Sequence, residues 1–321
     1  MNILVTGGLG AIGSWATRSV IESGNHPVVF DSATDSHLIG DIRDQVDIIT
    51  GSISDLPSLL STIANHRIER VIHTAALMPP ACHNFPDQAI AINIAGALNV
   101  MEACRLSDVK RLVCFSSKAV YGSVPEPHNY PNYVPVPESL RLAPINIYGG
   151  TKVMVEELAK NFRSRYGLSV ACLRLASTFG PGKSRHGELA IHSQLIDSAL
   201  AQVPMKIKQG GEESCDLIFN GDVGRGAVAA VLCDTSNASV FNIGTGQAIR
   251  FDDFAAAVRK VVPGASIDVG GGLNYMEQKN PTYCVLDVGL ARKELDFRAK
   301  YFGEEAVAAY VDAKKKLDSR S

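Results

Sequence analysis

The sequence lacks the features that mark nucleic-acid-binding and membrane proteins. Its 31 Lys and Arg residues stand against 33 Asp and Glu residues, which leaves a formal net charge of −2. This balance gives no electrostatic reason to expect nucleic acid or an anionic membrane surface as a partner. No apolar run approaches the ~20 residues of a membrane span. We therefore expect neither a nucleic-acid partner nor a membrane partner.

Cysteine is sparse and irregularly spaced. The seven cysteines are an odd number, and no two of them form a C-x-x-C pair. This pattern argues against a disulfide framework and against a zinc site, so we predict no bound metal. The first residues show neither a basic segment nor a signal-peptide cleavage pattern. Because free thiols fit a reducing compartment, we expect a cytoplasmic protein.

What the sequence does contain is an alternation of two hydrophobic periodicities. Apolar residues make up 46% of the 321 residues and charged residues 20%, which is typical of a folded globular protein. Short apolar runs that indicate strands occupy residues 2–6, 27–31, 46–49, 70–73, 110–115 and 168–173. Helical patterns lie between them at 11–24, from about 55, and at about 87–105. Since parallel strands need such crossovers, this order predicts an α/β fold with a doubly wound parallel sheet.

The first strand ends at a glycine-rich turn, Gly7-Gly8-Leu9-Gly10-Ala11-Ile12-Gly13. Glycine has no Cβ to block a ligand, and the N–H groups that open the following helix attract a pyrophosphate. Asp31 ends the next apolar run, 18 residues after Gly13, close to the roughly 20 expected for a carboxylate on the adenosine ribose. A carboxylate repels a 2′-phosphate, so the pattern predicts NAD rather than NADP as the cofactor.

A second chemical signal is a tyrosine followed four residues later by a lysine. Tyr148 and Lys152 lie on one face of a helix at this spacing. A nearby ammonium stabilises a phenolate and lowers its pKa from ~10. Tyrosines 275 and 310 also precede a lysine by four residues. Only Tyr148 lies downstream of a hydroxyl cluster at a strand end, which includes Ser117, and we therefore predict that Tyr148 is the catalytic base.

With these motifs the chain resembles the extended short-chain dehydrogenase/reductase family, which includes sugar epimerases and dehydratases. The resemblance covers nearly the whole chain in order. It is carried by residues 6–13, 73–76, 93–96, 116–122, 148–152, 173–175 and 179–182. It implies that Tyr148 transfers a proton, that Lys152 binds the nicotinamide ribose and lowers the tyrosine pKa, and that Ser117 orients the reacting oxygen. It also implies a homodimer.

The same resemblance assigns a set of residues to the cofactor. They are Gly7, Gly10, Ala11, Ile12, Gly13, Asp31, Ser32, Ser52, Ile53, Ala75, Ala76, Asn93, Tyr148, Lys152 and Leu175. Within this set Asn93 supports the site from its long helix. The glycine turn holds the pyrophosphate, and Asp31 holds the adenosine ribose.

The pattern loosens after about residue 178, which indicates a second lobe. A helix is expected at 188–201, a strand at 240–244 and a helix at 252–262. We assign the NAD-binding Rossmann domain to residues 1–178 and about 216–247. We assign a smaller C-terminal substrate-binding lobe to residues about 179–215 and 248–321.

The C-terminal lobe departs from the resemblance at two places. Members that act on nucleotide sugars usually hold the substrate diphosphate with arginines there. Cys215 stands where one arginine is expected, before Asp216, and residues 280–283 lack the other. A thiol cannot replace a bidentate cation. We therefore predict a substrate without a nucleotide diphosphate, such as a free sugar, polyol or hydroxy acid. The candidates for contacting this substrate are Ser117, Arg141, Arg185 and His186.

Together these features predict an NAD-dependent oxidoreductase that interconverts a secondary alcohol and a ketone on a small polyhydroxylated substrate. One alternative is a sugar epimerase or dehydratase, which includes a nucleotide-sugar epimerase, with NAD regenerated in each cycle. The oxidation step of that alternative uses the same residues. A second alternative is a non-catalytic sensor that binds NAD. Steady accumulation of NADH separates the first prediction from the epimerase.

Overall fold

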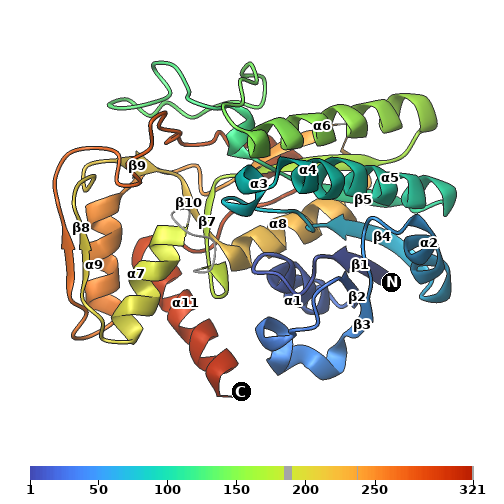
Figure 1. Cartoon of the computed structure of the whole chain (residues 1–321), viewed down its shortest axis with the longest axis horizontal. Coiled ribbons are helices and arrows are strands. Elements are labelled where there is room, and N and C mark those ends of the chain that lie inside the picture. The colour runs from blue at the N-terminus through green and yellow to red at the C-terminus, as the bar shows by residue number, and fades with distance from the viewer. Residues whose placement is uncertain (184–189, 237, 320–321) are drawn as a thin grey trace.

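A parallel sheet forms the centre of the larger lobe. The computed structural model describes residues 1–183, 190–236 and 238–319. Within this part of the chain the main sheet has seven strands in the order β11-β6-β5-β4-β1-β2-β3, and all neighbours are parallel. The strands are β1 (Asn2–Thr6), β2 (His26–Asp31), β3 (Asp47–Thr50), β4 (Ile68–His73), β5 (Arg111–Ser117), β6 (Val170–Leu175) and β11 (Val240–Ile243). The predicted doubly wound Rossmann sheet is confirmed (Figure 1).

The strand order reverses between β1 and β4. From β1 the chain builds outward to β2 and β3, then returns to place β4 on the other side of β1. Thr6 ends β1 between Phe30 of β2 and His73 of β4. In sheets of this kind a crevice opens beyond the carboxyl ends of the strands at such a reversal, and ligands bind there.

Helices cover both faces of the sheet because successive side chains of its strands point to opposite faces, and most of them are apolar. Ile3 and Val5 of β1 pack with α1 (Gly13–Glu22) and α8 (Asn220–Leu232). Leu4 points the other way and packs with the helices of the opposite face. These are α2 (Leu56–Asn65), α5 (Ala97–Leu106) and α6 (Ile147–Tyr166). Figure 1 shows α5 and α6 on one side of the sheet and α1 and α8 on the other.

The long helix expected at about 87–105 is built from three pieces. They are α4 (Pro86–Ala89), a π-helical segment η2 (Ile90–Gly96) and α5. By length and composition the continuous helix Pro86–Leu106 could cross a membrane, with a mean hydropathy of 1.3 over the window tested. The sequence analysis expected no membrane-spanning segment because Asn93 and Asn99 interrupt the apolar run in this helix. These two residues lower its mean hydropathy only slightly, so the helix still passes a test based on that mean. Within the fold 44% of that window is buried, and the helix packs against α2 and α6.

The smaller lobe combines helices with short two-stranded sheets. Its helices include α7 (Ile191–Leu200), α9 (Phe251–Val261) and α11 (Gly303–Asp318). The sheet pairs are β7 (Ser177–Phe179) with β10 (Leu217–Phe219), β8 (Met205–Ile207) with β13 (Ile267–Val269), and β9 (Ser214–Cys215) with β12 (Ile249–Arg250). Four short helical elements complete the described part of the chain. Three of them precede residue 178, namely η1 (His37–Gln45), α3 (Ala81–Asn84) and η3 (Lys118–Val120), and the fourth is α10 (Gly289–Glu294). Phe179, Phe219, Phe254 and Tyr310 lie in the core of this lobe.

A buried ion pair ties α6 to the sheet near the carboxyl ends of β5 and β6. Arg174 of β6 donates to both carboxylate oxygens of Glu156, at 2.9 and 2.7 Å. Glu156 also accepts from the Ser116 hydroxyl at 2.5 Å, and Arg174 donates to the Tyr121 hydroxyl at 2.9 Å. Tyr121 in turn donates to Asn242 of β11 at 2.8 Å. Because every member is hydrogen-bonded, the network holds β5, β6, β11 and α6 in one fixed arrangement.

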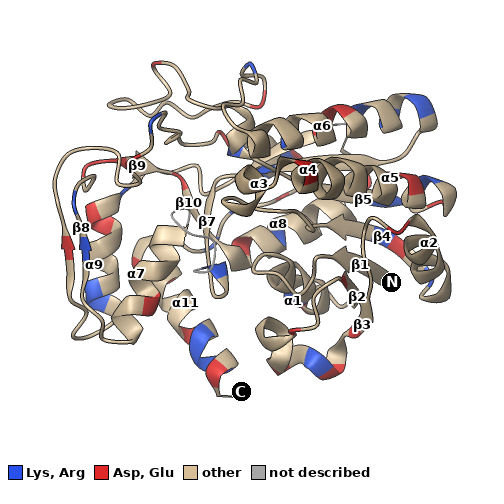
Figure 2. Cartoon of the chain, viewed as in Figure 1, with Lys and Arg blue, Asp and Glu red and all other residues tan. Residues whose placement is uncertain are grey.

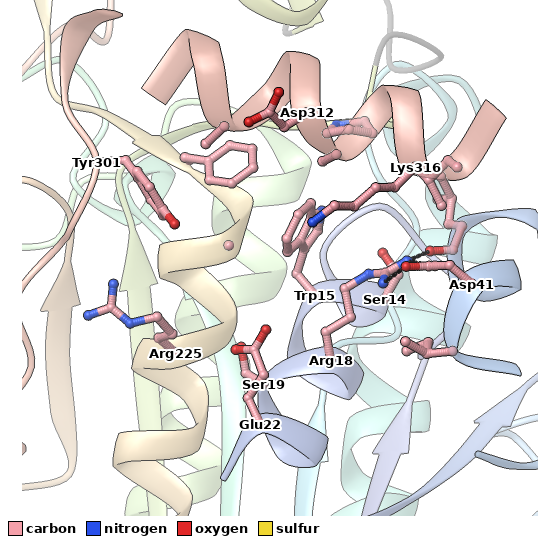
Figure 3. Close-up of a pocket in the computed structure, with 18 of the residues that line it drawn as sticks. Ser14, Trp15, Arg18, Ser19, Glu22, Asp41, Arg225, Tyr301, Asp312 and Lys316 are labelled. Carbon is pink, nitrogen blue, oxygen red and sulfur yellow. Dashed lines mark hydrogen bonds and ion pairs between the residues drawn. The ribbon is translucent and has the colours of Figure 1, made fainter. Parts of the chain in front are cut away.

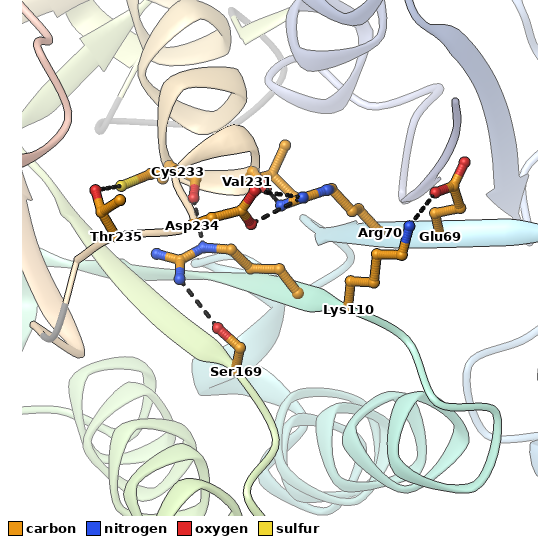
Figure 4. A network of polar contacts seen from close by, with 10 residues as sticks. Glu69, Arg70, Lys110, Ser169, Val231, Cys233, Asp234 and Thr235 are labelled. Atoms are coloured by element: carbon orange, nitrogen blue, oxygen red, sulfur yellow. Dashed lines mark hydrogen bonds and ion pairs between the residues drawn. The ribbon is translucent and has the colours of Figure 1, made fainter.

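Two buried arginines anchor the end of α8 at the opposite, amino edge of the sheet. Arg70 donates to the Val231 carbonyl at 2.6 Å and pairs with Asp234 at 2.8 Å (Figure 4). Arg111 donates to the Ala230 carbonyl at 2.7 Å. The last carbonyls of a helix have no partner within the helix and carry partial negative charge, so guanidinium groups stabilise them. The arginines therefore serve the fold rather than the ligand crevice.

The outer surface carries charges of both signs. On the side shown in Figure 2, blue and red segments are interspersed along η1, α9 and α11. This mixture agrees with the net charge of −2. All seven cysteines are free thiols, and all but Cys233 are buried.

Candidate active site

The glycine turn opens onto a cavity of about 350 Å³ at the point where the strand order reverses. The predicted cofactor residues that line it are Gly7, Gly10, Ala11, Ile12, Gly13, Asp31, Ser32, Ser52, Ile53, Ala75 and Ala76. The lining residues that the sequence did not suggest include Met78, Ile92 and Lys183. The cavity therefore runs from the end of β2 across β1 to the end of β4, as a dinucleotide requires.

The three spaced glycines of the turn serve different purposes. Gly7 has φ +72, and a Cβ there would lie 2.7 Å from the backbone of Ala75. A Cβ on Gly13 would lie 2.0 Å from the Gly7 carbonyl oxygen, so this glycine lets α1 pack onto the turn. Gly10 is exposed, and a Cβ there would meet only the Gly7 oxygen, at 3.2 Å. Its missing side chain therefore leaves room for the pyrophosphate of NAD.

The very start of α1 is open to a ligand. Within the described residues the N–H groups of Ile12 and Gly13 have no acceptor and no side-chain cap, whereas the Ser14 N–H already donates to the Gly10 carbonyl at 2.9 Å. Uncapped N–H groups at a helix start carry partial positive charge and bind phosphate well. The residues present thus fit the pyrophosphate of NAD.

Asp31 stands at the adenosine end of the cavity with its carboxylate already oriented. One oxygen accepts from the Leu9 N–H and the other from the Ala33 N–H, both at 3.0 Å. Asp31 is half-buried and lines the cavity beside Ser32. The Leu9 bond links the end of β2 to the glycine turn, and both bonds together aim the carboxylate, which suits the ribose contact predicted for it.

Ser117, Tyr148 and Lys152 meet at the carboxyl edge of β5. Asn146 caps α6 by accepting from the Gly149 N–H at 2.8 Å, which starts the helix one residue before Tyr148. A Cβ on Gly149 would lie 2.6 Å from the Ala119 carbonyl oxygen, so α6 lies directly against the residues that follow Ser117. Lys152 donates to the Phe115 carbonyl at 2.8 Å, and its Nζ lies 5.6 Å from the Tyr148 ring centre.

Burial dominates the ionisation of these groups. It raises the pKa of Tyr148 above its ordinary value, and contact with the Ser117 hydroxyl lowers that pKa in part. Burial also lowers the pKa of Lys152 to about 8. In the protein without NAD this burial outweighs any effect of Lys152, because both groups share one poorly solvated site. The expected lowering of the tyrosine pKa by Lys152 together with the cationic nicotinamide stays a prediction for the complex with NAD. A further positive charge beside the phenol is needed before it can act as a base at neutral pH.

Asn93 acts by positioning the wall of the cavity. Its side chain accepts from the Leu77 N–H at 2.6 Å and donates to the Leu77 carbonyl at 3.0 Å. It also donates to the Thr151 hydroxyl of α6 at 3.3 Å. The π-helical segment that carries Asn93 thereby ties the loop after β4 to α6, the helix that carries Tyr148. A π-helical segment is often found at such sites.

The remaining predicted residues lie elsewhere. Leu175 is 5% exposed and belongs to the apolar core beneath the site. Arg141 is exposed on the irregular loop between β5 and α6. Arg185 and His186 lie outside the described residues.

The expected arginine positions hold no cation. Cys215 is 1% exposed, and its thiol lies 3.3 Å from the Tyr275 hydroxyl. Asp216 is fully buried and accepts from the Thr245 N–H at 2.8 Å and from its hydroxyl at 2.7 Å. Asp216 thus fastens the turn after β11, which is a structural role.

Two lysines border the site without having been predicted. Lys118 follows Ser117 directly, and its ammonium donates to the Thr282 carbonyl at 3.0 Å. Lys183 is 8% exposed, lines the cofactor cavity and donates to the Thr178 hydroxyl. Lys118 lies beside Ser117, and Lys183 directly follows the segment 179–182 that supports the family resemblance. A single lysine forms no spaced pattern with other residues, so the sequence did not predict that either of them borders the site.

A larger cavity of about 750 Å³ lies away from the catalytic edge, between α1, η1, α8 and α11 (Figure 3). Its charged groups are of both signs. Arg18 is paired with Asp41 and Arg225 with Asp222. The Arg18 guanidinium lies 5.5 Å from the ring centre of Trp15.

The buried histidines predict a loss of stability in acid. Desolvation lowers the pKa of His73 and of His192 to about 3. Between pH ~6.5, the pKa of a histidine in the unfolded chain, and the lowered pKa in the folded protein, the unfolded chain binds more protons than the folded one. The free energy of unfolding therefore decreases as the pH is lowered through this window, by up to ~1.4 kcal/mol per pH unit for each histidine. We expect the free energy of unfolding to decline steadily from pH 6.5 towards pH 4. Denaturant titrations at each pH measure it.

His192→Phe provides the matched test of this acid sensitivity. The ring of His192 packs edge-on against Phe251, Phe254 and Tyr275, so phenylalanine fits its surroundings. The variant should show a shallower decline than the unchanged protein, while the substitution His83→Gln at an exposed histidine serves as the matched control. If the free energy of unfolding of His192→Phe falls as steeply in acid as that of the unchanged protein, His192 is not a source of the acid sensitivity.

Comparisons with known proteins agree with this geometry. The sequence model of the NAD dependent epimerase/dehydratase family matches residues 3–244. A putative UDP-glucose 4-epimerase of Methanocaldococcus jannaschii is 31% identical over 249 residues, covering 76% of this chain and 77% of that protein. UDP-glucose 4-epimerase of Bacillus subtilis is 30% identical over 344 residues, covering 96% and 95%. The crystal structure of UDP-glucose 4-epimerase from Thermotoga maritima with UDP-glucose superposes with a TM-score of 0.86 at 27% identity, covering 98% of this chain and 99% of that chain.

Proposed function

The chain belongs to the NAD dependent epimerase/dehydratase family, and from this membership we propose that it is a sugar-nucleotide epimerase. It is an enzyme whose cofactor is NAD. The convergence of Ser117, Tyr148 and Lys152 beside a cavity that fits this cofactor supports the oxidation step, and the observation that carries the epimerase assignment is the similarity to epimerases over most of the chain. The UDP-glucose 4-epimerases to which it is similar over most of its length support the finer assignment.

The roles of the three residues follow from their positions. When bound by the glycine turn and Asp31, NAD would supply reversible hydride transfer at the substrate carbon. Tyr148 takes the proton of the sugar hydroxyl and later gives it back to the same oxygen. Ser117, which contacts the Tyr148 hydroxyl, donates to the carbonyl oxygen formed in between. Lys152 keeps its position through the Phe115 carbonyl and supplies positive charge near the phenol.

The comparisons favour the epimerase over the net oxidoreductase that the sequence suggested. Both reactions begin with the same oxidation, so the residues of the site do not separate them. One observation still favours a dehydrogenase as a second candidate. Cys215 is buried and neutral where an arginine for a substrate diphosphate is expected, whereas a free sugar acid needs no arginine there.

A turnover assay separates the candidates. Purified enzyme with saturating NAD and UDP-glucose should form UDP-galactose. Proton NMR of the anomeric signals of the two sugars measures this conversion. The NADH absorbance band should not grow, because the hydride is returned in each cycle. Growth of that band in proportion to substrate consumed overturns the epimerase in favour of the dehydrogenase. Tight NAD binding with no turnover of sugar nucleotides, free sugars or polyols favours the sensor.

We also propose that the protein is a homodimer through α5 and α6. Large apolar side chains are exposed on these helices and the residues leading into them. They include Ile90, Leu98, Leu106, Ile147, Met154 and Tyr166, which are 37–55% exposed. A second copy that packs its own α5 and α6 there would remove this surface from water.

A further inference from the structure

We propose that Lys183 is a cofactor-binding residue whose ammonium contacts the pyrophosphate of NAD from the smaller lobe. The resemblance to the family assigns the pyrophosphate to the glycine turn, which belongs to the larger lobe. Lys183 adds a positive charge to that site from across the lobe boundary. Both candidate reactions need NAD, so the contact does not depend on which of them the enzyme catalyses, and binding measurements without turnover test it.

A tight turn after β7 brings Lys183 to the edge of the glycine turn. In Figure 1, β7 runs at the junction of the two lobes, beside β10. The Lys183 N–H donates to the Gly180 carbonyl at 3.2 Å, which closes the turn. Gly180 lies against Asn220, where a Cβ would be 2.4 Å from the amide nitrogen. The same amide donates to the Ala11 carbonyl at 3.0 Å, so one side chain links the two turns.

The other side of this turn packs on η1. Gly182 has φ +83, and a Cβ there would lie 2.5 Å from a methyl carbon of Leu38. Element η1 follows the end of β2, where Asp31 is expected to hold the adenosine ribose. The turn that carries Lys183 is therefore fixed on two sides, by the start of α8 and by η1, next to the glycine turn between β1 and α1.

The side chain of Lys183 borders the cofactor cavity. It lines the same 350 Å³ as Gly10, Ala11 and Ile12 of the glycine turn. Lys183 is only 8% exposed, and its ammonium donates to the Thr178 hydroxyl. An ammonium has three donors, so two of them remain for a ligand in the cavity.

In the part of the chain that the structure describes, Lys183 pairs with no carboxylate. The buried Arg174, by contrast, pairs with Glu156. Burial lowers the pKa of Lys183 to about 8, and the positive charge of Lys118 lowers it in the same direction, so the group is still mostly protonated at pH 7. A buried charge without a partner is costly. The missing anion is therefore expected to be part of a ligand.

The pyrophosphate is the part of NAD that supplies this anion. The adenine and the two riboses are neutral, and the oxidised nicotinamide ring is positive. The free N–H groups at the start of α1 attract the same pyrophosphate. Because Lys183 and Gly10 line one cavity, a single pyrophosphate between them is expected to accept from the N–H groups on one side and from the ammonium on the other.

The test compares ligands with and without the pyrophosphate. Lys183→Met should raise the dissociation constants of NAD and of ADP-ribose alike, by about tenfold to a hundredfold, because a hydrogen bond to a charged group is lost. Adenosine lacks the pyrophosphate and should bind as before. Lys183→Arg keeps the charge and should retain most of the affinity, and Lys208→Met at an exposed lysine should change no ligand. Calorimetry measures NAD and ADP-ribose, and ligand-observed NMR measures adenosine.

Thermal unfolding gives a second readout. Without NAD the buried ammonium lacks an anion, so its replacement by an apolar side chain of similar length should raise the unfolding midpoint of the NAD-free protein. Saturating NAD should then stabilise Lys183→Met less than it stabilises the unchanged protein. A lysine that only fastens its turn to the Thr178 hydroxyl predicts the opposite, a lower midpoint without NAD and no selective loss of ligands that contain pyrophosphate.

Three outcomes overturn the inference. The first is an NAD dissociation constant of Lys183→Met within twofold of that of the unchanged protein. The second is an equal loss of affinity for ADP-ribose and adenosine, which assigns the lysine a structural role. The third is a loss of UDP affinity with NAD binding unchanged, which assigns it to a substrate diphosphate. Should Lys183→Met fail to fold, Lys183→Gln and Lys183→Arg with the same ligands decide the question. Absence of sugar-nucleotide turnover contradicts the epimerase alone and leaves these binding results unaffected.

Discussion

Replacing Tyr148 with phenylalanine is expected to lower turnover by about 10²–10⁴-fold, the range for loss of a general acid–base group. The substitution removes one oxygen atom and keeps the ring. Without the phenol no group is placed to take the proton of the sugar hydroxyl, since Lys152 is committed to the Phe115 carbonyl at 2.8 Å. Ser117 remains but has far too high a pKa to serve as a base. Steady-state turnover with the preferred sugar nucleotide measures the effect.

The variant should keep its affinity for NAD. The cavity around the glycine turn and Asp31 is built from other elements, and the Lys152 contact does not involve the Tyr148 oxygen. Tyr310→Phe is the matched control, because Tyr310 also precedes a lysine by four residues yet bonds to Asp197 in the smaller lobe. That control should retain turnover. Full activity in Tyr148→Phe with intact NAD binding would remove this tyrosine from the mechanism.

The half-buried position of Tyr148 also predicts how its chemistry depends on the cofactor. Burial alone raises the pKa of the phenol. The positive charge of oxidised nicotinamide would act in the opposite direction, together with the ammonium of Lys152. The tyrosine is therefore expected to ionise readily only in the complex with NAD, and the order of binding should be cofactor first.

The parts of the fold that the sequence predicted are those with strong local patterns. Apolar runs of four to six residues between helical segments specified the large sheet, and the strand ends placed Asp31 and Ser117 at its ligand-binding edge. The spaced glycines predicted the cofactor cavity because only glycine fits positions like 7 and 13. In each case a local structural requirement, such as a buried strand or a turn without a Cβ, can be met by only a few residue types, so the sequence pattern identifies it.

The parts that were missed have weak or nonlocal signals. Strands of two or three residues, such as β9 and β10, are too short to show a period of two. Helix α8 is rich in small residues, and Gly224 lets it approach the Trp15 backbone, where a Cβ would lie 2.4 Å from the carbonyl oxygen. The charge of Lys183 matters only through its position in space. The pKa of Tyr148 depends on burial, which no spacing reveals.

Gly10→Ala is expected to weaken NAD binding by about tenfold to a hundredfold while the fold survives. A Cβ on Gly10 would approach only the Gly7 oxygen, at 3.2 Å, so the turn needs to shift by a few tenths of an ångström. The added methyl instead points into the space that the pyrophosphate must enter. Overpacking of this kind costs about 1–3 kcal/mol, which is about 5- to 150-fold in a dissociation constant. Isothermal titration calorimetry with NAD measures it.

The neighbouring glycines make this prediction specific. Gly13→Ala places a Cβ 2.0 Å from the Gly7 oxygen, which α1 cannot accommodate without moving, so that variant should lose thermal stability even without ligand. Gly40→Ala has no heavy atom within 4 Å of its new Cβ and should alter neither property. If Gly10→Ala binds NAD as tightly as the unchanged protein, the pyrophosphate does not lie over this turn. The cofactor would then have to enter the cavity by another route, and Ser117, Tyr148 and Lys152 would no longer be aligned on its nicotinamide ring.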